Sequence, residues 1–288
     1  MFLKNINNEL SFIFDDGGRS SSPVGYGIGI AEIVGSNPTR SIINIYKIIK
    51  VIKNKLYFIN WERKITKTKV GNNIVVVKKN TSFTSLRQFI LIFCFTLISI
   101  CSGNPANPPE IGKRILENES FESRNKLKLI GINCPKLFSI TDEEIIEEYI
   151  DGGNLYSFFT TEKENDLAFE VGKITGKLHK KGLVFIDNKC QNFLVTKNRD
   201  VIRIDLGFIQ KSDSVFAQSM DIGSFLASIL DLEPSIYKLI EKEFLIGYIK
   251  MTNKKIPYLS IILRNILALG FVYSHKNMLK NMLNKHYA

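Results

Sequence analysis

The sequence predicts an α+β protein in two lobes, a small antiparallel β lobe over residues 42–150 and a mainly helical lobe over 151–288. Short β-branched or alternating runs dominate residues 55–79, whereas helix-forming segments dominate the chain beyond residue 163. The 288 residues, 44% of them apolar, can bury a sizeable core. This composition excludes a disordered or collagen-like chain.

The first 41 residues are expected to lie outside this fold. The segment 17–41 differs in composition from the remainder, which is rich in Lys, Asn and Ile. Its run Val-Gly-Ser-Asn-Pro-Thr can be encoded by a sequence that resembles the T-arm of a transfer RNA gene. We therefore expect residues 1–41 to reflect a misassigned start. The glycines Gly25, Gly27 and Gly29 lack the spacing of a phosphate-binding loop.

The elements expected in the small lobe are strands with one long helix. Three runs read as an antiparallel meander, and a helix-forming segment ends at Gly131, as a helix should. Two further strands, a turn and then helical sequence follow. The expected bounds are strands at 55–61, 64–70 and 72–79, a helix at 110–129, strands at 134–140 and 143–150, a turn at 151–155, and a helix from about 163 to 180.

The most apolar stretch, residues 88–101, interrupts this order. It is shorter than the roughly 20 apolar residues that a membrane span needs. We expect a helix buried against the small lobe or used as a partner surface. Shallow membrane contact through 88–101 is the alternative.

Charge and cysteine content suggest the compartment and the partners. Lys and Arg outnumber Asp and Glu by 13 to 5 in residues 1–80 and by 7 to 0 in 244–288, whereas residues 81–243 hold 19 against 23. Basic ends suit an RNA-associated or other phosphate-bearing partner, although a solvated lysine-rich surface explains them as well. The four cysteines form no CxxC pair, which indicates reduced thiols and a cytoplasmic protein.

The chemistry concentrates in residues 178–207. Asp187 and Asn192 lie five residues apart in a loop, and Asp205 follows at the end of the strand-like run VIRID. Two of these side chains can hold a hard divalent cation on nucleotide phosphates, which leaves one carboxylate to accept a hydroxyl proton. Alone, each would read as an ordinary turn residue.

Together these residues resemble the catalytic core of the protein kinase-like superfamily. The family pattern LHxxGxxHxDxxxxN, followed by a hairpin and a D-[FL]-G triplet, is matched by Leu178, His179, Gly182, Asp187, Asn192, Asp205 and Gly207. The path from Asp205 to the next helix, near Met220, is too short for a full activation segment. The sequence therefore resembles the compact branch, the RIO and Bud32-like kinases.

The resemblance implies a two-lobed kinase fold that uses ATP with Mg²⁺ or Mn²⁺. Asp187 would be the catalytic base, and Asn192 and Asp205 the metal ligands. Lys78 in the run VVVKK would grip the phosphates, with Lys79 as the one-residue alternative.

The resemblance also assigns residues to the small lobe and to the connection between the lobes. Glu119 would pair with the phosphate-binding lysine, with Glu117 and Glu122 as alternatives. The run EEYIDGGNL resembles the segment that binds the adenine edge through backbone groups, here at Glu148, Tyr149 and Ile150.

Two departures from the family pattern keep two functions open. Phe185 stands where the family usually has histidine, and NWERK (60–64) contains no glycine where a phosphate-covering loop is expected. The first function is an ATP-dependent phosphotransferase acting on a Ser/Thr hydroxyl of a protein substrate. The alternative is a catalytically weak or inactive kinase-like scaffold.

Overall fold

The computed structural model describes residues 64–71, 73–79, 85–110, 113–162, 164–271 and 281–282. All of them fall within one compact unit, Lys55–Ala288. The segment 1–41, the first expected strand at 55–61 and residues 60–63 of the NWERK loop lie outside the described residues. The expectations for them, like the lobe boundaries at 42, 150 and 151, stay predictions.

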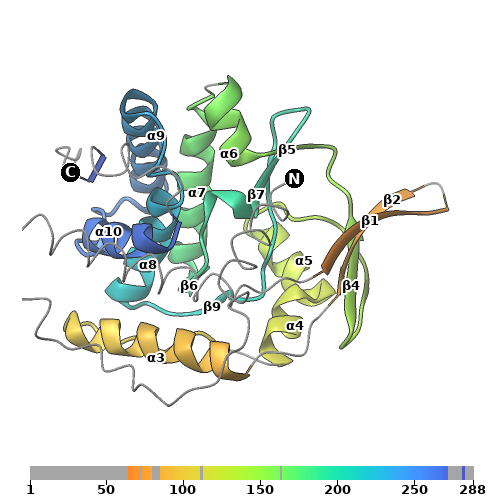
Figure 1. Ribbon diagram of the computed structural model, residues 1–288, viewed down its shortest axis with the longest axis horizontal. Helices are drawn as coiled ribbons and strands as arrows, with labels where there is room; N and C mark the ends of the chain where they lie inside the picture. Colours follow the sequence, from red (N-terminus) through yellow and green to blue (C-terminus); the bar gives the residue numbers. More distant parts are fainter. Residues whose placement is uncertain are drawn as a thin grey trace, which may run out of the picture. The chain divides into compact units, whose positions relative to one another are not determined.

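The small lobe contains an antiparallel sheet of four strands in the order β1-β2-β4-β3, labelled as in Figure 1. Alternating burial along the second strand directs Val75 and Val77 to one face and Lys78 to the other. Gly71, with φ of 60°, makes the tight turn of the first hairpin. The strands are β1 (Lys64–Val70), β2 (Asn73–Lys79), β3 (Leu137–Ile140) and β4 (Glu144–Glu148).

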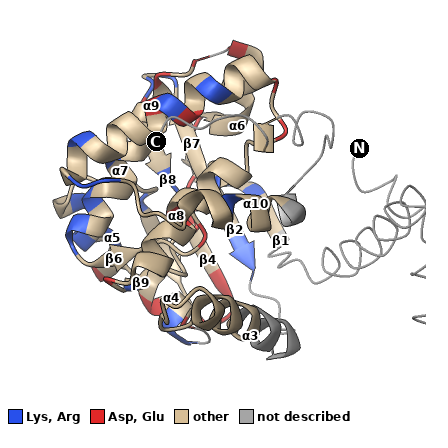
Figure 2. Ribbon diagram, turned by 90° about the vertical axis from the view of Figure 1, so that its left-hand side faces the viewer, with Lys and Arg blue, Asp and Glu red and all other residues tan. Residues whose placement is uncertain are grey.

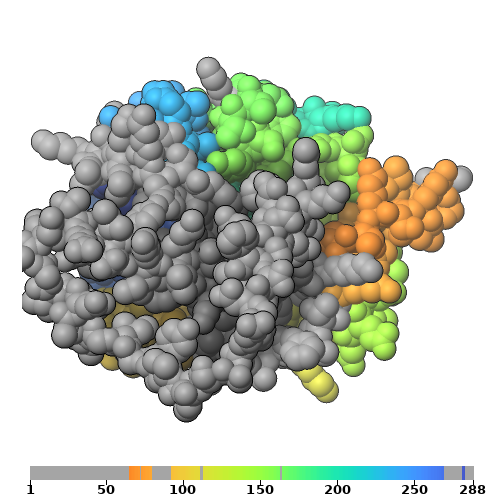
Figure 3. Space-filling view, viewed as in Figure 1, coloured from red at the N-terminus to blue at the C-terminus, as the bar shows by residue number. Residues whose placement is uncertain are grey.

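The β1–β2 hairpin extends to the edge of the molecule that is drawn in orange in Figure 3. Its apolar residues Ile65 and Val70 are 63% and 58% exposed. Lys78 lies at the end of the hairpin away from the turn at Gly71, and its side chain is buried.

The expected helix at 110–129 is two helices, α4 (Lys113–Glu119) and α5 (Phe121–Leu129). Ser120 is extended, with ψ of 164°, and its hydroxyl accepts the Ser123 N–H at 3.4 Å as the N-cap of α5. The expectation of one continuous helix was wrong because a serine inside a helix-forming run competes for the backbone. The expected end at Gly131 is confirmed, where φ is 76°.

The apolar run forms the helix α3 (Ser85–Cys101), but its buried contacts among the described residues are with the large lobe, where the small lobe was expected. Phe95 is 2% exposed and meets Phe216 edge-to-face, with ring centroids 5.0 Å apart. Leu259 and Leu263 complete this apolar cluster. In Figure 2 the part of the α3 ribbon that is not grey is tan, the colour of residues other than Lys, Arg, Asp and Glu. Among the described helices, none is long and apolar enough to cross a membrane.

The large lobe is built on four helices, α7 (Leu167–Lys180), α8 (Val215–Ala227), α9 (Pro234–Thr252) and α10 (Ser260–Phe271). Helices α7 and α9 approach closely because each has a glycine at the contact. A Cβ on Gly172 would lie 2.0 Å from the carbonyl oxygen of Phe244, and one on Gly247 would lie 2.1 Å from that of Phe169.

Short strands beside these helices carry the loops of the candidate site. The expected turn at 151–155 is instead a strand, β5, followed by one helical turn. The remaining elements are β5 (Gly152–Asn154), α6 (Leu155–Ser157), a π-helical turn (Phe158–Glu162), β6 (Leu183–Val184), a 3-10 turn (Cys190–Asn192), β7 (Phe193–Thr196), β8 (Val201–Arg203) and β9 (Gln210–Lys211). Strands pair as β5-β7-β8 and as β6-β9. The α+β fold class in two parts is confirmed.

Candidate active site

The β7–β8 hairpin brings the predicted catalytic and metal residues to one end of the large lobe. The amide nitrogen of Asn192 donates to the carbonyl oxygen of Asp187 at 2.9 Å and to its Oδ2 at 3.2 Å. The N–H of Ile204 donates to the carbonyl of Asn192 at 2.9 Å, so Asp205 follows directly across the hairpin. The nitrogen of the Asn192 side chain is used within the loop, which leaves its Oδ1 as the atom able to bind a metal.

Lys189 lies beside the candidate base. Its Nζ is 3.0 Å from Asp187 Oδ2, and the Asp187 carboxylate raises the pKa of Lys189 although burial acts against this. The Asp187 side chain is 22% exposed, so it can be reached from outside. The pair therefore presents a carboxylate and a cation at an accessible position.

Asp221, on α8, holds the backbone of this loop and was not assigned a role from the sequence. It is fully buried and accepts the N–H groups of Phe185 and Ile186, both at 2.7 Å. His179 Nε2 donates to it at 3.0 Å, and the other ring nitrogen of His179 lies 2.9 Å from the Tyr248 hydroxyl. The bonds stabilise Ile186 at φ of 64°, a left-handed conformation that costs a β-branched residue about 1–3 kcal/mol.

A sequence signal for Asp221 did exist. Within the apolar helix VFAQSMDIGSFLA it is the one charged residue. A carboxylate in an otherwise apolar helix is expected to accept hydrogen bonds from buried donors, because burying an isolated carboxylate costs free energy.

Arg203 explains why an aromatic residue is accepted at the histidine position of the family pattern. Its guanidinium carbon lies 4.4 Å from the ring centroid of Phe185 and 4.9 Å from that of Phe193. One nitrogen donates to the carbonyl of Asp187 at 2.8 Å. Burial lowers the pKa of Arg203, and the nearby acids act against this. Phe185 thus contributes a cation–π face that supports the loop.

In the small lobe the structure buries Lys78 and exposes Lys79. The expected partner of Lys78 was wrong, because its ion pair is with Glu147, with Nζ 2.6 Å from Oε1. Lys78 is paired with Ile145 in the β2–β4 ladder, so Glu147 is its diagonal neighbour on the same face of the sheet. Adjacent strands bring this acid closer than the helix that carries Glu119.

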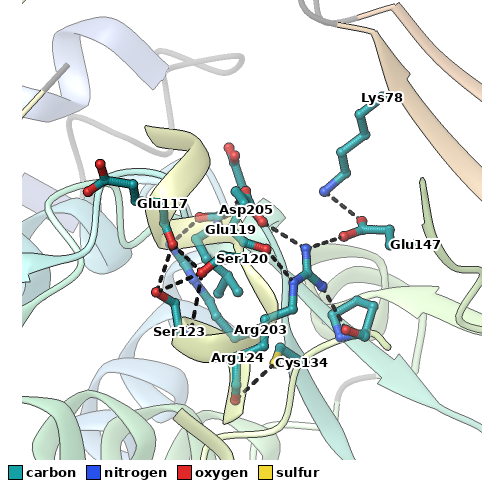
Figure 4. Close-up of polar contacts among 12 residues, drawn as sticks. Lys78, Glu117, Glu119, Ser120, Ser123, Arg124, Cys134, Glu147, Arg203 and Asp205 are labelled. Atoms are coloured by element: carbon teal, nitrogen blue, oxygen red, sulfur yellow. Dashed lines mark hydrogen bonds and ion pairs between the residues drawn. The ribbon is translucent and has the colours of Figure 1, made fainter. Parts of the chain in front are cut away.

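Glu119 is instead held by Arg124, whose Nη2 lies 2.8 Å from it and 2.7 Å from Glu147 (Figure 4). The second oxygen of Glu119 accepts the N–H of Leu206, the residue after Asp205, at 3.0 Å. Glu119 therefore contacts the turn that follows Asp205. The alternatives Glu117 and Glu122 pair elsewhere, with Arg114 and Lys126.

The predicted adenine-binding segment, Glu148–Ile150, begins at the last residue of β4. The N–H of Glu148 donates to the Lys136 carbonyl at 2.8 Å, and that of Tyr149 to the Ile74 carbonyl at 3.4 Å. Lys67 Nζ lies 3.6 Å from the centroid of the Tyr149 ring. These donors are used in the sheet, so an adenine edge at Glu148–Ile150 would rely on other backbone groups of the segment.

The donor set fits a nucleotide with a divalent cation. Lys78 Nζ is buried, and no acceptor among the described residues meets it in good hydrogen-bond geometry. A phosphate oxygen would supply that acceptor. Asn192 and Asp205 offer oxygen ligands, which Mg²⁺ and Mn²⁺ favour. The described residues contain no cluster of three or more His, Cys, Asp or Glu side chains that could hold a metal ion.

The α+β fold in two parts is consistent with a two-lobed kinase-like fold. No family model matches the chain. The chain is 29% identical over 157 residues to the KEOPS complex subunit Bud32 of Pyrococcus abyssi, and the match covers 51% of this chain and 70% of that protein. This likeness confirms the resemblance to the RIO/Bud32-like kinases that residues 178–207 indicated.

Longer relatives match over the same share of this chain. The chain is 30% identical over 133 residues to a probable bifunctional tRNA threonylcarbamoyladenosine biosynthesis protein of Methanococcus maripaludis, covering 42% of this chain and 22% of that protein. The corresponding protein of Methanospirillum hungatei is 29% identical over 158 residues, with 54% and 28% covered. The matched part is about a quarter of these bifunctional proteins.

Proposed function

We propose that this chain is an ATP-dependent phosphotransferase of the Bud32-like type, acting on a Ser/Thr hydroxyl of a protein. The observation that carries the proposal is the grouping of Asp187, Asn192 and Asp205 at the end of one hairpin. Lys78 completes the set from the small lobe. Each residue type is the one that phosphoryl transfer requires at its place.

The proposed roles divide between binding and chemistry. Lys78 binds phosphate oxygens, and Asn192 Oδ1 with Asp205 holds Mg²⁺ or Mn²⁺. The cation, when bound, neutralises charge that develops on the transferred group. The backbone at Glu148–Ile150 binds the adenine edge.

Asp187 is the proposed base. The acceptor hydroxyl oxygen forms a bond to the γ-phosphorus while the bond to the β–γ bridging oxygen breaks and ADP leaves. The hydroxyl proton passes to the Asp187 carboxylate. Lys189 Nζ, 3.0 Å from Asp187 Oδ2, holds the carboxylate in place through their ion pair.

A kinase-like scaffold without transfer activity is the second candidate, and the observation favouring it is the absence of glycine in NWERK (60–64). Most of that loop lies outside the described residues. The two candidates make different predictions, because a scaffold needs no ionised Asp187 and no metal.

The names of the relatives suggest partners. Two of them are tRNA threonylcarbamoyladenosine biosynthesis proteins and one is a KEOPS complex subunit. We propose that this chain also works in a cytoplasmic protein assembly connected with RNA, with the basic termini as the contacting regions. An electrophoretic shift with tRNA, present in the full chain and lost when the six lysines of residues 244–288 are neutralised, would support this, with the buried Arg264 left unchanged.

The test of the proposed function is nucleotide binding and turnover by the purified full chain with Mg²⁺ or Mn²⁺. A transferase binds ATP more tightly with the metal and releases ADP in step with phosphorylation of a protein acceptor or of itself. ATP binding without turnover would favour the scaffold. No ATP binding in either metal would overturn both the transferase and its assigned site.

A further inference from the structure

The buried side chains of the small lobe converge on Arg124, in α5. Its guanidinium is 5% exposed in this arrangement and contacts acids from two separate elements, Glu119 of α4 and Glu147 of β4. We propose that Arg124 is a positioning residue that sets the place of the phosphate-binding lysine relative to the metal-binding aspartate. The inference rests on the proposed function.

The guanidinium is fixed by four hydrogen bonds. Nη2 contacts both carboxylates, Nε donates to the Glu119 carbonyl at 3.0 Å, and Nη1 donates to the Pro135 carbonyl at 2.6 Å. A planar guanidinium has five N–H donors in a rigid fork, so bonds in four directions leave it one orientation. Arg124 therefore acts as a fixed point between α4, α5 and β4.

One path of ion pairs leads from Arg124 through Glu147 to Lys78, the proposed phosphate-binding residue. The Glu147 oxygen that Arg124 leaves open pairs with Lys78 Nζ at 2.6 Å. Glu147 is 3% exposed and Lys78 5%. The lysine position is thus set by an acid that Arg124 itself holds.

The other path leads to the metal side. Glu119 is fully buried, and its Oε1 accepts the Leu206 N–H at 3.0 Å. Leu206 follows Asp205, whose φ of 57° lies in the left-handed region. Figure 4 shows the Arg124 guanidinium between Glu119 and Glu147, with Lys78 bonded to Glu147. Glu119 thereby fixes the turn that carries the metal ligand.

The electrostatics favour one connected unit over separate pairs. Burial alone would lower the pKa of Arg124, but the carboxylates of Glu119 and Glu147 outweigh it and the pKa is raised. The positive charges of Lys78 and Arg124 thus balance the negative charges of Glu119 and Glu147 in a buried position. Removing the central cation leaves two buried acids competing for weaker partners.

The consequence is a coupling between two binding events. Lys78 contacts the phosphates directly, and Asp205 reaches the same phosphates through the cation. Their relative position decides how much the metal tightens ATP binding. Lysine at position 124 keeps the charge but cannot make the forked contacts, so the metal-dependent gain should fall even in a folded protein.

The experiment measures ATP dissociation constants of the full chain by calorimetry, once with EDTA and once with Mg²⁺. The ratio of the two constants is the metal-dependent gain. Arg124→Lys should reduce that gain at least about fivefold. The control Arg114→Lys replaces an exposed arginine of α4 and should leave the gain unchanged. Far-ultraviolet circular dichroism confirms that each variant is folded.

A second pair of variants keeps the test decisive where Arg124→Lys does not fold. Glu119→Gln weakens the contact between Arg124 and the turn after Asp205 but keeps the Lys78–Glu147 ion pair, so the metal-dependent gain should fall by more than the constant in EDTA changes. Its control is Glu122→Gln, at an exposed glutamate in the first turn of α5. An unchanged gain in Arg124→Lys or, failing that variant, in Glu119→Gln would overturn the inference. A wild-type chain that does not bind ATP would overturn the proposed function itself, which is a different result.

Discussion

The two sides of the candidate site are held in different ways. On the large-lobe side, residues 185–206 form one loop and hairpin, and a single buried anion, Asp221, collects their donors. On the small-lobe side, Lys78, Arg124 and Glu147 come from three elements and alternate in charge. A loop with local connectivity can be recognised from spacing, whereas a charge network built from distant segments cannot.

Substitutions on the two sides of the site should have different effects. The loop depends on backbone donors meeting one carboxylate, so loss of that acceptor disturbs several residues at once. The charge network shares each acid between two donors, so loss of one member shifts the others. We therefore expect loop variants to lose chemistry or stability outright and network variants to lose affinity by degrees.

The largest expected effect is on the metal ligand of the hairpin. Asp205→Asn should remove the metal-dependent part of ATP binding and turnover, since the substitution takes away the negative charge of the one carboxylate among the two proposed metal ligands. Calorimetry with and without Mg²⁺ measures it, and the circular dichroism spectrum should be unchanged. ATP hydrolysis or autophosphorylation at the wild-type rate in this variant would remove Asp205 from the site.

Next in size is the buried anion that supports the loop. Asp221→Asn should lower the free energy of unfolding by about 3 kcal/mol, because an amide group turned toward the N–H of Phe185 or Ile186 cannot accept its bond. Urea denaturation gives the value. Asp213→Asn, at an exposed acid eight residues before Asp221, is the control and should change the free energy of unfolding little. Equal stabilities for the two variants would mean that the loop is not held by Asp221.

The network side predicts a smaller, graded loss. Lys78→Met should raise the ATP dissociation constant about tenfold, because one charge-assisted contact to phosphate is lost. Lys79→Met, in the exposed neighbour, should leave the constant unchanged. Equal effects of the two substitutions would show that the phosphates do not bind on the buried face of β2.

The smallest effect concerns an acid outside both regions. Burial raises the pKa of Asp231, although the Tyr156 hydroxyl donates to it at 3.0 Å and acts against this. A raised folded pKa means that stability is lost as the pH rises from the unfolded pKa through the folded one. Asp231→Asn should therefore be slightly stabilising at pH 7.

That gain should shrink as the pH falls below the ordinary pKa of aspartate, since both chains are then neutral at this position. Thermal melting of wild type and variant at pH 7 and pH 3 measures the difference. A variant less stable than wild type at pH 7 would show that the charge of Asp231 is favourable in the folded state.

Sequence reasoning found the loop because its residues lie within one short stretch. Asp187, Asn192 and Asp205 could be recognised from spacing, and the alternation of VVVKK indicated Lys78 over Lys79. The α+β class followed from the order of periodic runs. In each case neighbours in sequence are also neighbours in space.

The parts that sequence reasoning missed depend on contacts between distant segments. The partner of Lys78 could not be read from helix phase, because β-sheet register places Glu147 beside it. The packing side of α3 was also wrong, because periodicity shows that a run is buried but not which element covers it. Ser120 divided the expected helix through a local cap that composition hides.

The most direct test of the account is the turnover number of the full chain at saturating ATP and Mg²⁺ with Asp187→Ala, beside Asp213→Ala as the exposed control. The account predicts a loss of roughly 100-fold or more for Asp187→Ala, the scale on which positioned bases act, with the ATP dissociation constant nearly unchanged. The control should turn over as wild type does. Wild-type turnover that survives Asp187→Ala would contradict the account and place the chemistry elsewhere in the chain.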